Sequence, residues 1–108
     1  MEKLTSKDRI KVFSKKVCRM IIMTLYPNNV MRFSELKREL GLSPSSLSQT
    51  LFFLLDCGIL LRSLTMDVPS QTEYSLTKKG RAAAKLIDSM IKLSEVPVSN
   101  EEEPPTFI

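Results

Sequence analysis

The chain of 108 residues contains no histidine, the commonest general base in enzymes, and only two cysteines, Cys18 and Cys57. Two cysteines alone do not make a zinc site, and a disulfide framework is not expected in a chain kept in the cytosol. No paired carboxylates, glycine-rich phosphate loop or nucleophile motif replaces the missing imidazole. We therefore predict a protein that is not an enzyme and that needs no cofactor or metal.

Long apolar runs are missing as well. The longest candidate, residues 20–25, is far shorter than the roughly 20 residues of a membrane span. The first residues are charged and lack the apolar core of a signal peptide. We expect a cytoplasmic protein that makes no contact with a membrane, and the length fits a single domain.

The charge is unevenly distributed along the chain. All 16 basic residues and only eight of the 12 acidic residues precede Glu95, so this part carries +8 and the remainder −4. A basic body suits a polyanionic partner. Proline and consecutive glutamates after Glu95 are typical of disorder. The predicted organisation is a domain over residues 1–94 and an acidic disordered tail over residues 95–108.

The N-terminal part predicts one helix over residues 6–26, capped by Thr5 or Ser6 and ended by Pro27. Its last two turns are apolar on all sides, which is typical of a helix buried on more than one face. Basic side chains recur every fourth residue, and they either face solvent or meet phosphate. These residues are Lys7, Lys11, Lys15 and Arg19.

Two short helices with a tight turn follow. Ser34 is a suitable cap for the first, and Gly41 can take the left-handed conformation that ends it. Ser43 and Pro44 are typical of the cap and first position of the second helix, which runs to about Cys57. Two short helices joined by a glycine-containing turn make a helix-turn-helix.

A change of period after Gly58 indicates strands over residues 59–64 and 72–76, joined by turn-forming residues. A hairpin directly after a helix-turn-helix is a wing. Thr77 caps a last helix over residues 78–94. Gly80 within that helix is either a close approach to another backbone or an ordinary surface glycine. The predicted fold is mainly α with a small β-hairpin, a winged helix-turn-helix.

Several strings of the chain resemble the HxlR family of bacterial and archaeal regulators, relatives of MarR. They are residues 32–36 (RFSEL), 41–44 (GLSP), 47–49 (LSQ), 68–69 (VP) and 73–80 (EYSLTKKG). The resemblance implies a winged helix dimer paired through its first and last helices. It also implies a recognition helix in the major groove and a wing at the flanking minor groove. Many members repress genes, and some sense oxidants through an N-terminal cysteine.

The chain departs from this family pattern in three ways. It lacks the N-terminal Cys-Pro segment, and Val17 replaces the tryptophan of the first helix. Cys18 is therefore interpreted as a small buried hydrophobe and not as the sensing cysteine. The recognition helix has no Lys or Arg, and it carries Phe52 and Phe53 where the family places polar residues.

The recognition helix has a buried stripe of Leu47, Leu51 and Leu54, so polar side chains occupy its other faces. Glutamine can bond bidentately to adenine, and serine can contact bases or phosphates. Basic residues around the helix are expected to meet phosphates, with Arg81 as a further candidate. The residues predicted to contact DNA are Arg32, Ser34, Lys37, Arg38, Ser43, Ser45, Ser46, Ser48, Gln49, Arg62, Gln71, Lys78 and Lys79.

The terminal helices are predicted to form a homodimer, since one small core does not cover all of their apolar residues. The residues predicted at this interface are Phe13, Val17, Met20, Ile21, Ala83, Leu86, Ile87, Met90 and Ile91. The expected function is a sequence-specific double-stranded DNA-binding transcriptional repressor acting as a homodimer. The alternative is a winged helix that binds another protein through Phe52 and Phe53. The sequence neither indicates nor excludes a small-molecule effector site.

Overall fold

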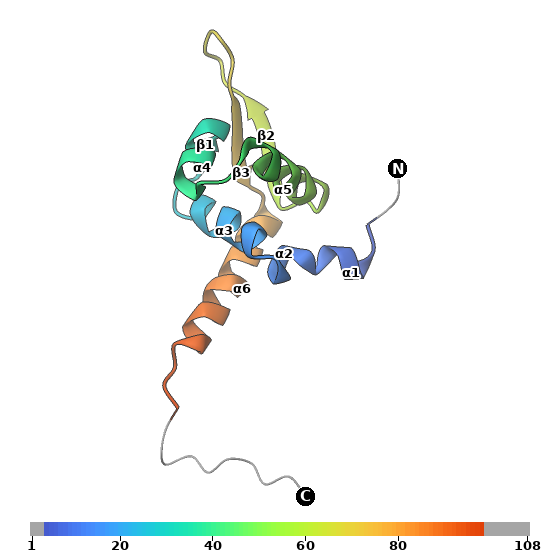
Figure 1. Cartoon of the computed structure of the whole chain (residues 1–108), viewed down its shortest axis with the longest axis vertical. Coiled ribbons are helices and arrows are strands. Elements are labelled where there is room, and N and C mark those ends of the chain that lie inside the picture. Colours follow the sequence, from blue (N-terminus) through green and yellow to red (C-terminus); the bar gives the residue numbers. More distant parts are fainter. Residues whose placement is uncertain (1–3, 99–108) are drawn as a thin grey trace, which may run out of the picture.

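The computed structural model describes residues 4–98, and most of the predicted acidic tail lies outside them. The predicted winged helix-turn-helix is confirmed in outline (Figure 1). The elements are, in order, α1 (Ser6–Arg9), α2 (Lys11–Ser14), α3 (Lys16–Leu25), β1 (Val30–Arg32), α4 (Phe33–Leu40), α5 (Pro44–Asp56), β2 (Leu60–Leu64), β3 (Thr72–Leu76) and α6 (Lys78–Ser94).

The single N-terminal helix predicted from the sequence is wrong. The segment divides into α1, α2 and α3, and Lys15 between the last two has an extended backbone with φ −88° and ψ 127°. Val12 and Cys18 are both buried, although a continuous helix would place them about 120° apart. The break lets both enter the core, and Arg19 donates to the freed carbonyl oxygen of Phe13. The four basic residues predicted along one helix face are therefore distributed over α1, α2 and α3, with Lys15 at the break.

The sheet has three antiparallel strands in the order β1-β3-β2, one more than the predicted hairpin. Val30 pairs with Ser75 and Arg32 with Glu73, so β1 lies beside β3, on the edge of β3 opposite β2. At three residues β1 is too short to show alternation in sequence. It also shifts the start of α4. Arg32, and not Ser34, holds the cap position, where its backbone N–H donates to Glu35 Oε1 at 2.9 Å.

The other predicted helix ends are confirmed. Gly41 ends α4 with φ 64°, in the left-handed region that favours glycine. Ser43 Oγ accepts from the backbone N–H of Ser46 at 3.2 Å, and Pro44 takes the first turn of α5. Thr77 Oγ1 accepts from the N–H of Gly80 at 2.9 Å at the start of α6. These caps satisfy N–H groups that a helix start leaves free.

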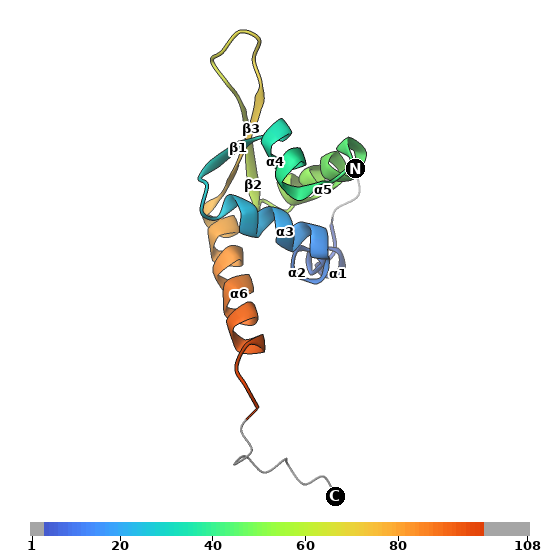
Figure 2. The same ribbon diagram turned by 60° about the vertical axis from the view of Figure 1, so that its left-hand side comes forward.

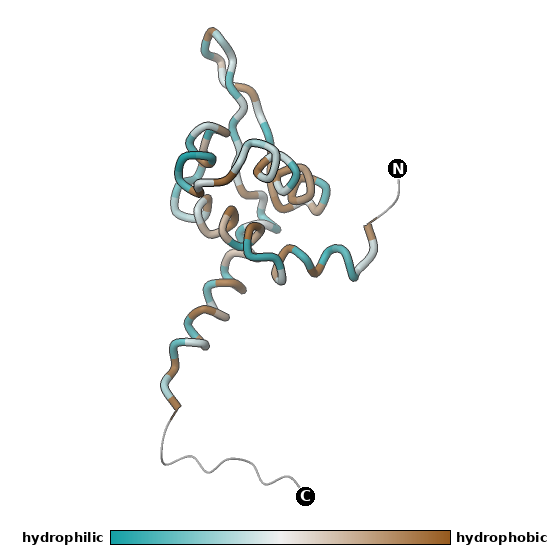
Figure 3. The backbone as a smooth tube through the Cα atoms, viewed as in Figure 1, coloured by the Kyte–Doolittle hydropathy of each residue, from teal (hydrophilic) through white to brown (hydrophobic). Residues whose placement is uncertain are grey.

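The core lies where α3, α5 and the first half of α6 meet beside the sheet (Figure 2). The predicted leucine stripe of α5 is fully buried, as are Ile21, Ile22 and Leu25 of α3. Beyond this core α6 continues away from the body, and hydrophobic positions continue along it (Figure 3). In the described part of the chain, every helix is too short or too polar to traverse a lipid bilayer.

Candidate nucleic-acid interface

The recognition helix α5 presents neutral polar side chains. Ser45 and Gln49 are exposed on the face turned away from the leucine stripe, and Ser48 is half-buried at its edge. The hydroxyl of Ser43 is engaged as the cap of α5, which leaves it less free than predicted. The two phenylalanines separate, since Phe53 packs against the core while Phe52 is 58% exposed. This face can make hydrogen bonds and one apolar contact, but it carries no charge.

Four of the predicted cations are exposed on other elements of the domain: Lys37 and Arg38 on α4, Arg62 on β2 and Lys78 at the start of α6. None of them pairs with a carboxylate among residues 4–98; the ion pairs found there involve Lys11, Arg32 and Lys92. Their charges are therefore open to an external anion. The neutral polar side chains of α5 can contact base edges, while the unpaired cations bind the phosphates beside them.

Lys79 has a hydrogen-bond partner within the chain. Its Nζ donates to the carbonyl oxygen of Cys57 at 2.7 Å, directly after the last turn of α5. A cation at a helix C-terminus satisfies a free carbonyl and opposes the negative end of the helix dipole. Lys79 therefore links the start of α6 to the end of α5, and its predicted contact with phosphate stays a prediction.

Substitution of Lys78 and of Lys79 is expected to affect different properties of the protein. Lys79→Ala is expected to lower the free energy of unfolding by about 0.5–1 kcal/mol through loss of this contact, with little effect on the salt dependence of DNA binding. Lys78→Ala should do the reverse, because the Lys78 side chain is exposed and, unlike that of Lys79, makes no hydrogen bond or ion pair within residues 4–98. Thermal melting and salt titration of both variants make the measurement. Equal effects of the two changes on DNA binding would contradict the assignment.

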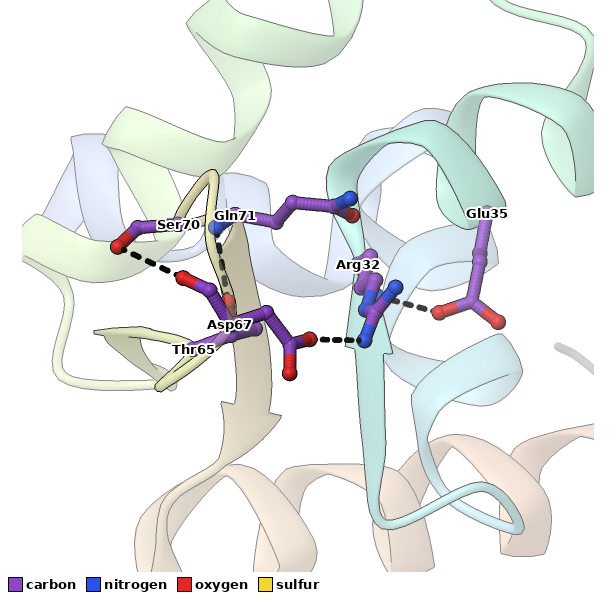
Figure 4. A network of polar contacts seen from close by, with 6 residues as sticks. All are labelled: Arg32, Glu35, Thr65, Asp67, Ser70 and Gln71. Atoms are coloured by element: carbon purple, nitrogen blue, oxygen red, sulfur yellow. Dashed lines mark hydrogen bonds and ion pairs between the residues drawn. The ribbon is translucent and has the colours of Figure 1, made fainter.

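Three other predicted residues, Arg32, Ser34 and Gln71, come together. With Phe33 and Thr72 they line a hollow of about 360 Å³ between the wing and the N-terminal end of α4. Arg32 Nη2 lies 2.9 Å from Asp67 Oδ2 on the wing loop (Figure 4). In the sequence, Asp67 is one of the turn-forming residues between the two predicted strands, and nothing near it indicates Arg32 as its partner. An acidic residue in an otherwise uncharged wing loop was the one signal that could have identified it.

The two thiols are buried, as interpreted for Cys18. Burial raises the pKa of Cys18 above its ordinary value, and burial likewise raises the pKa of Cys57. Thiols that resist ionisation are poor nucleophiles and metal ligands. Within residues 4–98 no three His, Cys, Asp or Glu side chains gather where a metal ion could bind.

The residues predicted at the dimer interface divide into two groups. Ile21, Ala83 and Ile87 lie in the core of the protomer, so their assignment to an intermolecular surface is wrong. They are buried because α3 and α6 pack on each other within one chain. The remaining predicted interface residues are half-buried or exposed: Phe13, Val17, Met20, Leu86, Met90 and Ile91. Four of them, Phe13, Met20, Met90 and Ile91, line an apolar pocket of about 410 Å³ beside α6.

Residues 12–102 match the family described as HxlR-like helix-turn-helix. The chain is 34% identical over 73 residues to a protein of Fusobacterium mortiferum named as a regulator, MalR, covering 67% of this chain and 69% of that protein. It is 34% identical over 84 residues to the uncharacterized HTH-type transcriptional regulator YvaP of Bacillus subtilis, covering 77% of each. Among solved structures, a Salmonella typhimurium protein named as a transcriptional regulator, ytfH, superposes with a TM-score of 0.73 at 29% identity. The superposition covers 88% of this chain and 85% of that one.

Proposed function

Since the chain belongs to the HxlR-like helix-turn-helix family of transcriptional regulators, we propose that it represses transcription by binding double-stranded DNA sequence-specifically as a homodimer. The observation that carries this proposal is the exposed, uncharged face of α5 flanked by cations without carboxylate partners. Helix α5 enters the major groove, and the β2–β3 hairpin reaches the backbone beside it. A dimer bound across a promoter then competes with transcription initiation.

Affinity and specificity come from different residues in this arrangement. Lys37 and Arg38 neutralise phosphates whatever the sequence, and each neutralised phosphate contributes about 0.9 to the log–log slope of affinity against salt. Gln49 is exposed on α5 and reads a base edge, which is worth roughly 1–3 kcal/mol when the contact is bidentate. Two-fold symmetry repeats both effects in half-sites about 34 Å apart.

A salt titration tests this division of roles. An operator is first obtained by selecting genomic fragments on the immobilised protein. Lys37→Ala and Arg38→Ala should weaken binding to operator and to scrambled DNA and should flatten the salt slope. Gln49→Ala should leave the slope unchanged and relax the preference at one base pair of each half-site. Lys85→Ala is the matched control, since it removes the charge of an exposed lysine on α6, away from α5.

Two results would contradict the proposal. If Gln49→Ala lowers both affinities equally, α5 does not read bases. If the unaltered protein binds no duplex more tightly than a scrambled one, sequence-specific binding is excluded.

A protein-binding role for α5 is the second candidate, favoured by the exposure of Phe52. An aromatic side chain on a helix surface is a frequent anchor of protein interfaces. Phe52→Ser separates the two candidates. If α5 binds DNA, the variant should keep the salt dependence of DNA affinity. If α5 binds another protein, the variant should no longer capture that protein.

The homodimer rests on the second half of α6. Leu86 and Met90 lie one turn apart on this helix and are 58% and 46% exposed. Ile91 and Leu93 continue the exposed apolar surface toward the end of the helix. A second copy of the chain would cover these side chains, and two-fold pairing of equal surfaces is the commonest form of assembly.

A further inference from the structure

The side chain of Arg32 is turned toward the wing. Arg32 ends β1, where Glu73 of β3 is its partner in the strand ladder. Its guanidinium nevertheless pairs with Asp67 of the wing loop at 2.9 Å, and the carboxylate of Glu35 is engaged by the backbone N–H of Arg32 (Figure 4). The charged end of Arg32 therefore lies at the hollow between the wing and α4, with Asp67 as its anion.

The wing loop does not need this ion pair to stay closed. Thr65 and Gln71 close the loop by two hydrogen bonds. Thr65 N donates to Gln71 O at 2.8 Å, and Gln71 N donates to Thr65 Oγ1 at 2.9 Å. The side chains of Arg32 and Asp67 are 40% and 60% exposed, and exposed ion pairs add little to stability. The pair can therefore be exchanged for another at low cost, without unfolding the hairpin.

The hollow beside the ion pair suits a phosphate group. Besides Arg32 it is lined by the hydroxyl-bearing Ser34 and Thr72 and by the amide-bearing Gln71. Guanidinium groups bind phosphate in a bidentate fashion, and hydroxyl and amide groups add donors to the remaining oxygens. The wing loop itself, residues 65–71, has no Lys or Arg, so the cation that lines this hollow and can meet the DNA backbone there is Arg32.

We propose that Asp67 occupies on Arg32, in the free protein, the position that a DNA backbone phosphate takes in the complex. The wing thus carries an internal competitor for its own phosphate site, a role that rests on the DNA-binding function proposed above. The competitor weakens contact with any duplex. The protein is then held back from nonspecific DNA until the bases read by α5 compensate for the exchange.

The test is a double-mutant cycle on Arg32 and Asp67 with a labelled random-sequence DNA duplex. Asp67→Asn keeps the shape of the side chain and removes its charge. It is expected to tighten binding by about two- to fivefold per protomer at low salt, and to steepen the salt slope by up to about 0.9 per protomer. In the Arg32→Gln background the same change should have no such effect, because no guanidinium is released.

Asp56→Asn is the matched control, because it removes the charge of another exposed aspartate, at the end of α5. It should leave the slope unchanged if release of Arg32 causes the effect. Thermal melting of each variant checks that the hairpin remains folded.

Three outcomes would overturn the inference. Asp67→Asn could leave affinity and salt slope unchanged, or it could have the same effect whether residue 32 is Arg or Gln. The control variant Asp56→Asn could also produce the same effect as Asp67→Asn. In each of these the unaltered protein still binds the duplex, so the proposed DNA-binding function stands. A protein that binds no duplex under any salt condition overturns both.

Discussion

The double variant Leu86→Glu/Met90→Glu is expected to be a folded monomer that binds operator DNA at least about 100-fold more weakly than the unaltered protein. Both side chains are substantially exposed on α6, so glutamate at these positions faces water in the monomer. In a dimer the same glutamates would be buried against their symmetry copies as uncompensated charges. Losing the dimer removes the second half-site, whose contribution through effective concentration is typically 100-fold or more.

Sedimentation at micromolar concentration and a gel shift on the operator make the measurement. Lys85→Glu is the matched control. It places a glutamate at an exposed position about 100° and 140° around α6 from Leu86 and Met90, and it should leave the protein dimeric. A monomer in the unaltered protein, or a dimer that persists in the double variant, would show that the second half of α6 is not the interface.

Gly80→Ala is expected to lower the free energy of unfolding by about 2–3 kcal/mol, although alanine favours helix by about 1 kcal/mol relative to glycine. A methyl group at Gly80 would overlap the backbone carbonyl oxygen of Ile59 and would lie 3.1 Å from Leu76 Cδ2. The same carbonyl oxygen accepts from the N–H of Thr77 at 3.0 Å, so it cannot move without breaking the junction of β2 and α6. Of the two interpretations of Gly80, close approach to a backbone is the one confirmed.

Gly41→Ala is the control for Gly80→Ala. Gly41 has φ 64° but no heavy atom within 4 Å of an added methyl group, so only the left-handed backbone is penalised, by about 1 kcal/mol. Denaturant unfolding of both variants separates crowding from backbone strain. Equal losses at the two positions would show that the contact with Ile59 is not the reason for glycine at position 80.

The sequence alone determined the helix-turn-helix and the last helix, because their signals act within a few residues. Ser43 and Thr77 cap helices whose N–H groups lie three residues ahead, and Gly41 adopts its left-handed turn where it was expected. The leucine stripe of α5 also follows from spacing alone, since residues four apart share a helix face. The position of the second helix of the helix-turn-helix, and the absence of Lys and Arg from it, could therefore be predicted.

Contacts between segments distant in the sequence were decided by the tertiary structure. The helix breaks at Lys15 because both Val12 and Cys18 are buried in the core. Strand β1 forms because Arg32 and its neighbours pair with β3, which is distant in the sequence. Neither contact can be predicted from the residues next to it. Lys79 is directed to Cys57, 22 residues away, and Asp67 is 35 residues from Arg32.

The apolar stripe of the last helix shows the same limit most clearly. Ile87 and Met90 are both apolar at helical spacing, yet Ile87 is 1% exposed and Met90 is 46% exposed. Hydrophobicity is non-directional, so the sequence predicts that a face is buried without stating what covers it. The packing of α3 on α6 made that distinction, because it buries Ile87 in the core of the protomer and leaves Met90 exposed.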